Sequence, residues 1–264
     1  MSSIFDSQQF NTNLFFPRSD ISPVPDFCDD YYIEVSEDIS IHCRRYLNIN
    51  AKLSLLFFHG NGEIVSDYDN LAGFFSELDV ELIVADFRGY GKSSGVPTLR
   101  DALEDSHIIL NYLKNKKVKD EDKNIPDQNI LKNKVCVMGR SLGSAPAIEL
   151  CSKRSDVQAC IIESGYADPI PLVERRGLKI NNVTQEENSV FNNSQKIRDV
   201  KCPTLIMHGE NDSLILPREA KLNYENGGSE TKLLEILEGV GHNDMMTAPN
   251  HSYFHTIRRF ISCL

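Results

Sequence analysis

Residues 135–144 constrain the fold of this chain more than any other stretch. They read Val-Cys-Val-Met-Gly-Arg-Ser-Leu-Gly-Ser, an apolar run followed at once by a serine among small residues. The run has the length and residue types of a buried strand. The pattern predicts a strand, a sharp turn and the start of a helix, with Ser141 held out of the sheet at the tip of the turn. Gly139 and Gly143 meet the need for small residues where strand and helix pass close together.

Strands and helices are predicted to alternate from residue 53 to the end of the chain. The expected strands are apolar throughout, which is typical of a parallel sheet covered by helices on both faces. Because such crossovers are right-handed, the loops after the strands open at one edge, where active sites of α/β sheets lie. The strands are expected at 53–58, 81–85, 135–138, 157–164, 204–208 and 232–237, and the helices at 64–78, 98–115, from the serine turn to about 153, at 217–225 and at 251–264.

Four further stretches complete the expected organisation. Residues 1–29 are polar and contain three prolines, which predicts a loosely ordered N-terminal arm, with residues 14–16 as the part that could pack on the body, before a single domain at 30–264. Residues 31–36 and 39–46 are predicted to form an antiparallel hairpin at the sheet edge. Residues 165–200 break the strand–helix rhythm, and we interpret them as a short lid insert. The polar stretch 116–133 is expected to be a surface connection.

Composition excludes several classes of function. The chain has 264 residues and a net charge of 28 − 38 = −10, which argues against a nucleic-acid partner. No apolar run approaches the ~20 residues needed to cross a bilayer, and no signal-peptide pattern is visible at the N-terminus. Seven cysteines, an odd number without metal-type spacing, favour a reducing compartment and no metal site. We expect a cytoplasmic protein without an integral membrane segment.

The residues after other strands supply what a serine nucleophile needs. A serine hydroxyl reacts poorly until a base takes its proton. His242, next to a glycine after the last expected strand, is the best candidate base, although an exposed loop histidine is the competing interpretation. A carboxylate must orient the imidazole. Asp212 is our choice because it follows the strand 204–208 after a short loop, and Glu163, at the end of the preceding strand, is the main rival.

Acyl transfer also needs donors that face the developing oxyanion. The backbone N–H groups of Leu142 and of Asn61, in the loop after strand 53–58, are the candidates. Glu63 is expected to orient this loop or to meet a substrate cation, and a carboxylate favoured in the first turn of a helix explains it equally well. Arg140 is a candidate for binding an anionic substrate group, but a surface arginine is the more favoured interpretation.

These residues together resemble the α/β-hydrolase superfamily, with Ser141, Asp212 and His242 in the same chain order. The likeness runs from about residue 30 to the end. Within this superfamily, the sequence resembles more specifically the serine hydrolases that carry two loops. These are a His-Gly-Asn-Gly oxyanion loop, here 59–62, and a loop that reads Asp-Phe-Arg-Gly-Tyr-Gly-Lys-Ser-Ser-Gly, here 86–95. Such enzymes include esterases, thioesterases that remove acyl groups from proteins, and monoacylglycerol-lipase-like enzymes.

The resemblance implies an eight-stranded, mostly parallel sheet, no cofactor and no metal. It also implies a small acyl-ester or thioester substrate cleaved through an acyl-enzyme. The alternative is a non-catalytic ligand-binding protein on the same scaffold. The insert at 165–200 departs from the lids of such enzymes because it is short and half polar.

Overall fold

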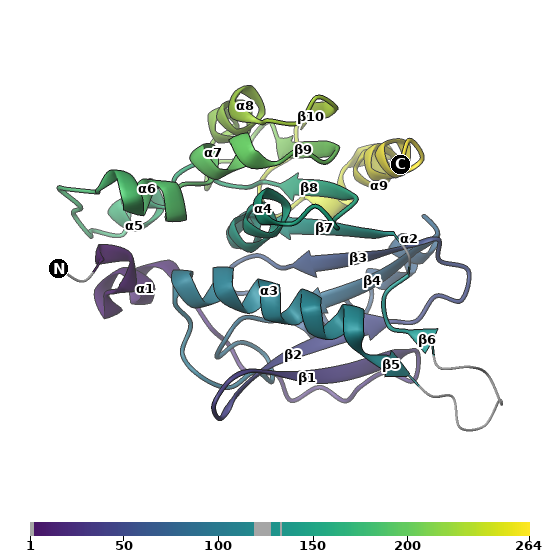
Figure 1. Cartoon of the computed structure of the whole chain (residues 1–264). Coiled ribbons are helices and arrows are strands. Elements are labelled where there is room, and N and C mark those ends of the chain that lie inside the picture. Colours follow the sequence, from purple (N-terminus) through teal and green to yellow (C-terminus); the bar gives the residue numbers. More distant parts are fainter. Residues whose placement is uncertain (1–2, 119–127, 133) are drawn as a thin grey trace.

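The computed structural model describes residues 3–118, 128–132 and 134–264 (Figure 1). An eight-stranded sheet runs through its centre in the order β1-β2-β4-β3-β7-β8-β9-β10. Strands β1 and β2 are antiparallel, β2 is antiparallel to β4, and all other pairs are parallel. The expected eight-stranded, mostly parallel sheet is therefore confirmed. The strands are β1 (Cys28–Ser36), β2 (Ile39–Tyr46), β3 (Leu53–Phe58), β4 (Val80–Ala85), β7 (Val135–Arg140), β8 (Ala159–Glu163), β9 (Thr204–Gly209) and β10 (Lys232–Leu237).

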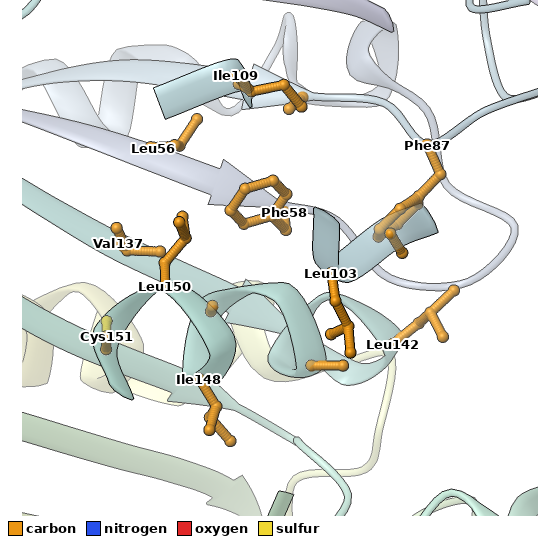
Figure 2. Close-up of a cluster of buried hydrophobic side chains, with 14 of the residues drawn as sticks. Leu56, Phe58, Phe87, Leu103, Ile109, Val137, Leu142, Ile148, Leu150 and Cys151 are labelled. Atoms are coloured by element: carbon orange, nitrogen blue, oxygen red, sulfur yellow. The ribbon is translucent and has the colours of Figure 1, made fainter. Parts of the chain in front are cut away.

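Helices cover both faces of the sheet, as the apolar strands predict. One face carries α3 (Leu99–Asn115), α4 (Ser144–Lys153) and α8 (Pro217–Asn226), and the other carries α2 (Ala72–Ser76) and α9 (Ser252–Ile261). The strands β3, β4, β7, β8 and β9 are buried along their whole length. Figure 2 shows part of the core under α3 and α4, where Leu142 of the serine turn joins the cluster that contains Phe58 and Leu103.

Most helices begin and end near the residues predicted from the sequence, and one predicted helix is interrupted. Helix α3 begins where expected, because Thr98 Oγ1 accepts a hydrogen bond from the backbone N–H of Asp101. The single helix expected at 64–78 is wrong. The chain forms a 3-10 turn, η2 (Val65–Tyr68), and then the short α2. In a continuous α-helix the carbonyl of Val65 would accept the N–H of Asp69. Here it accepts the Tyr46 hydroxyl, and the N–H of Asp69 donates to the carbonyl of Ser66.

The N-terminal arm is more ordered than its polar composition predicts. It forms η1 (Ile4–Asp6) and α1 (Gln8–Leu14), and the side chains of Phe5, Phe10, Leu14 and Phe15 are buried. Phe5 stacks on Phe191 with 4.3 Å between ring centroids. Asn11 Oδ1 accepts the N–H of Leu99, at the start of α3. The expectation of a loose arm is therefore wrong, because scattered phenylalanines gain partners in the insert and in α3.

The insert at 165–200 lies beside α1, at the end of the sheet toward which the arrowheads of the parallel strands point (Figure 1). It contains α5 (Ile170–Glu174), α6 (Gln185–Phe191), α7 (Asn193–Lys196) and η4 (Ile197–Asp199). The connection expected at 116–133 lies mostly outside the described residues, and its ends pair as β5 (Lys117–Val118) and β6 (Gln128–Asn129). Within the described part of the chain, no helix combines the length and apolarity that crossing a bilayer requires.

Candidate active site

Ser141 lies at the turn between β7 and α4, in the 3-10 helix η3 (Ser141–Gly143). Its φ of 51° is left-handed, a conformation that costs a serine of the order of 1–3 kcal/mol. A methyl group added to Gly139 would overlap the carbonyl of Gly143, and one added to Gly143 would overlap the carbonyl of Phe58. The expected need for small residues on both sides of the turn is confirmed.

Two loops bring a histidine and an aspartate to this serine. His242 Nε2 lies 3.0 Å from Ser141 Oγ, and His242 Nδ1 lies 2.6 Å from Asp212 Oδ2. With Nδ1 donating to the carboxylate, Nε2 keeps the lone pair that accepts the hydroxyl proton. The histidine side chain is 9% exposed and the aspartate side chain is fully buried. The residues predicted as nucleophile, base and acid thus form one hydrogen-bonded chain.

The loops after β9 and β10 are fixed to each other by backbone hydrogen bonds. The N–H of Glu210 donates to the carbonyl of Leu237, and the N–H of Asn211 donates to the carbonyl of Val240. These bonds continue the contact between the two segments beyond the last strand residues. They hold the loop that carries Asp212 against the loop that carries His242.

Asp212 has a second histidine neighbour. Its Oδ2 atom lies 3.1 Å from Nε2 of His208, which also donates to the carbonyl of Ile215, and its Oδ1 atom accepts two backbone N–H bonds. Burial alone would raise the pKa of Asp212, but the bonds from His208 and His242 outweigh it and hold that pKa far below its ordinary value. The sequence analysis did not include His208 in the site; its only sequence signal is its position at the end of an apolar strand, four residues before Asp212.

Glu163, the rival acid, has other partners. Its Oε2 atom accepts the hydroxyl of Tyr253 at 2.8 Å, and its Oε1 atom lies 3.3 Å from Nη1 of Arg140. Its side chain is fully buried, and burial raises its pKa in spite of the arginine beside it. The carboxylate nearest to the His242 ring nitrogens is therefore Asp212.

Arg140 is not the surface residue that the sequence favours. Only 7% of its side chain is exposed, and its guanidinium donates to Glu63, Glu163 and the backbone carbonyl of His242. The surface expectation is wrong because two acidic residues, Glu63 of the loop after β3 and Glu163 at the end of β8, converge on it. Arg140 thereby connects the loop after β3, the end of β8 and the loop that carries His242.

Glu63 holds the loop that follows β3. It accepts the N–H of Gly60 and the hydroxyl of Tyr68, and it pairs with Arg140 at 2.8 Å. Burial alone would raise the pKa of Glu63, but Arg140 and Tyr68 hold it below its ordinary value. These contacts are the ones expected if Glu63 orients the loop, which was one of the two functional interpretations.

The loop from 59 to 62 is fixed on both sides. His59 Nδ1 lies 2.8 Å from the carbonyl oxygen of Gly60, so this carbonyl points at the buried ring. In a trans peptide the next N–H, that of Asn61, points the opposite way. The Asn61 side chain binds the N-terminal arm: Nδ2 donates to the carbonyl of Leu14, and Oδ1 accepts the N–H of Phe16.

A cavity of about 320 Å³ opens beside Ser141. The arm contributes Leu14 and Phe16 to its wall, a role that the sequence analysis did not assign to them. The sequence-predicted residues Asn61, Glu63, Ser141, Leu142 and His242 also line it, and the remaining lining residues are Gly60, Leu172, Arg175, Arg176, Leu214, Ile215 and Asn243.

A family model described as "Serine aminopeptidase, S33", a group of α/β hydrolases, matches residues 49–183. Protein bem46 of Schizosaccharomyces pombe is 30% identical over 218 residues, which is 80% of this chain and 68% of bem46. The chain belongs to the α/β-hydrolase superfamily. Alpha/beta hydrolase domain-containing protein 17B of Homo sapiens is 28% identical to this α/β hydrolase, over 81% of this chain and 67% of the human protein. A Caenorhabditis elegans relative, aho-3, is matched over 58% of its length.

Solved structures agree with the fold of this α/β hydrolase. The Pyrococcus furiosus esterase Pf2001 superposes with a TM-score of 0.71 at 19% identity, covering 94% of this chain and 98% of the esterase. Est1E of Butyrivibrio proteoclasticus superposes with a TM-score of 0.66 at 17% identity, covering 88% and 97%. At these identities the likeness concerns the fold.

Proposed function

We propose that this α/β hydrolase cleaves a carboxylic ester or thioester through an acyl-enzyme, with Ser141 as nucleophile, His242 as base and Asp212 as orienting acid. The observation that carries the proposal is the unbroken hydrogen-bonded chain from Ser141 Oγ through His242 to Asp212, at 3.0 and 2.6 Å. This chain opens into a cavity that holds a substrate-sized volume.

In the first half of the reaction, Ser141 Oγ attacks the acyl carbon while His242 Nε2 takes its proton. Asp212 stabilises the imidazolium that forms, and its depressed pKa keeps it ionised at neutral pH. The N–H groups of Leu142 and Asn61 receive the oxyanion. His242 then returns its proton to the leaving alcohol or thiol, and the acyl-enzyme remains.

In the second half, water replaces the leaving group. His242 deprotonates the water, which attacks the acyl carbon, and Ser141 leaves with the proton that His242 returns. No cofactor is required by these steps. Glu63 and Arg140 act as positioning residues, because both side chains are bound to protein groups that hold the loops of His242 and Asn61.

The cavity favours a short or medium acyl chain. Its volume of about 320 Å³ is at the low end of the range for ligand sites, and Leu14, Leu172 and Ile215 give it apolar walls. The free cysteines of the described residues, of which five are buried, support the cytoplasmic location that we propose.

The test is labelling with a fluorophosphonate probe, followed by a panel of esters and thioesters of increasing acyl length. The wild-type protein should be labelled and should release a burst of chromophore, and Ser141→Ala should do neither. Ser262→Ala, at an exposed serine of the C-terminal end, is the matched control and should retain both. Labelling of Ser141→Ala at the wild-type level would remove the serine from the proposed role. Ligand binding without any burst would favour a non-catalytic binding protein.

A further inference from the structure

Two adjacent arginines line the cavity that contains Ser141. Arg175 and Arg176 follow α5 in the insert, and both side chains are exposed to solvent. Arg175 donates to the carbonyl of Leu214, in the loop after Asp212. Arg176 donates to the carbonyl of Asn13 and lies over the Phe16 ring, 4.4 Å from its centroid. Each guanidinium is thus anchored at the rim by one backbone carbonyl.

Neither arginine has an acidic partner among the described residues. The ion pairs of residues 3–118, 128–132 and 134–264 include none with Arg175 or Arg176, although Arg44, Arg88 and Arg140 each pair with two carboxylates. Glu63, which also lines the cavity, is already bound to Arg140. Partial burial lowers the pKa of Arg176, and the charge of Arg175 lowers it further.

We propose that Arg175 and Arg176 bind an anionic group of the substrate, a carboxylate or a phosphate, while Ser141 attacks its ester or thioester bond. This inference rests on the proposed function and narrows its substrate class. A guanidinium carries five N–H donors, so one backbone contact leaves most of them free for an anion's oxygens. Both arginines line the cavity that contains Ser141, so a substrate that occupies this cavity meets their unused N–H donors.

A structural explanation exists for the same residues. Basic side chains are favoured at the C-terminal end of a helix, and the two arginines follow the short helix α5. That explanation predicts no effect of either arginine on substrate choice. The two explanations therefore differ in one measurable quantity, the preference for a charged over a neutral substrate of the same length.

The experiment compares kcat/KM for two matched pairs of substrates. For a carboxylate on the acyl side, the pair is 4-nitrophenyl hydrogen adipate and 4-nitrophenyl hexanoate. For phosphate on the leaving group, it is S-butyryl-4′-phosphopantetheine and S-butyrylpantetheine. In Arg175→Gln/Arg176→Gln, the charged-to-neutral ratio should fall at least about tenfold for one pair. Arg218→Gln is the matched control, since that side chain is 71% exposed and does not line the cavity.

The substrate pair whose charged-to-neutral ratio falls in the double variant shows whether the anion is a carboxylate of the acyl group or a phosphate of the leaving group. In the wild type, the same ratio should fall with added salt, because exposed charges are screened. An unchanged ratio for both pairs overturns the inference while Ser141-dependent hydrolysis leaves the proposed function standing. If no substrate is hydrolysed, equilibrium binding of adipate and of inorganic phosphate decides instead. Weaker binding of either anion by the double variant supports the arginine site, and equal binding of both overturns it.

Discussion

Replacing Arg140 by methionine should destabilise the protein by about 4 kcal/mol at pH 7. The arginine side chain is 7% exposed and neutralises two carboxylates, at 2.8 Å to Glu63 and 3.3 Å to Glu163. Removing one partner of a buried ion pair costs about 3–5 kcal/mol, because the other charge is left buried without compensation. Glu163 dominates this cost since its side chain is fully buried, whereas that of Glu63 is 24% exposed. Methionine keeps the length of the side chain, so the loss of charge is the main change.

The pH dependence separates this cause from a packing defect. In the wild type the pKa of Glu63 is lowered, so its stabilising contribution is present above its ordinary pKa of 4.5 and is lost as the pH falls. In Arg140→Met both carboxyls lose the guanidinium and their pKa values rise, so the variant gains stability relative to wild type as they take up protons. The difference in the free energy of unfolding between the wild type and Arg140→Met should therefore become smaller as the pH is lowered from 7 to about 4.5.

Urea unfolding at both pH values measures the gap. Adding Glu163→Gln to Arg140→Met removes the uncompensated charge and should recover a large part of the loss, whereas additive effects are expected for independent sites. Arg218→Met, at an exposed arginine, is the matched control. The reasoning is refuted if Arg140→Met costs less than about 1 kcal/mol at pH 7, or if its cost is the same at both pH values.

Two further predictions concern the acid and the serine turn. Asp212→Asn should lower kcat on the order of 10⁴-fold, because an amide no longer selects the imidazole tautomer. Glu163→Gln should lower kcat far less in the same ester assay. The reverse ranking of the two variants would make Glu163 the acid. Gly143→Ala should yield little folded protein or cost at least about 3 kcal/mol by urea unfolding, because its methyl group overlaps the carbonyl of Phe58. The matched control Gly73→Ala has nothing within 4 Å of the added methyl group and should stabilise helix α2 by about 0.5–1 kcal/mol; equal effects of the two substitutions would contradict the close-approach interpretation.

The sequence predicts the frame of the fold well because that frame depends on local patterns. Apolar runs of strand length occur at the positions of β3, β7 and β9, and each is followed directly by polar residues with candidate chemistry. Parallel strands end at one edge of a sheet, so a serine after β7 and an aspartate after β9 are expected at the same edge. The order of the residues therefore predicts their meeting without any knowledge of distances.

What the sequence misses depends on contacts between distant segments. Burial of Arg140 results from Glu63 and Glu163, which lie 77 and 23 residues away along the chain. The order of the N-terminal arm likewise results from Phe5 packing on Phe191 of the insert. Local composition indicates that the arm and the insert are each polar. It does not indicate that the few apolar side chains of one segment pack against those of the other.

The arm and the candidate oxyanion loop depend on one side chain. Asn61 Nδ2 donates to the carbonyl of Leu14, while Asn61 Oδ1 accepts the N–H of Phe16 and the hydroxyl of Tyr90. The backbone of the same residue offers the N–H that we propose for the oxyanion. Because Leu14 and Phe16 line the cavity, any shift of the arm that changes the substrate space also pulls on this loop. The cavity wall and the backbone donor that we propose for the oxyanion are therefore connected through the Asn61 side chain, which is hydrogen-bonded to the arm on both sides of Phe15.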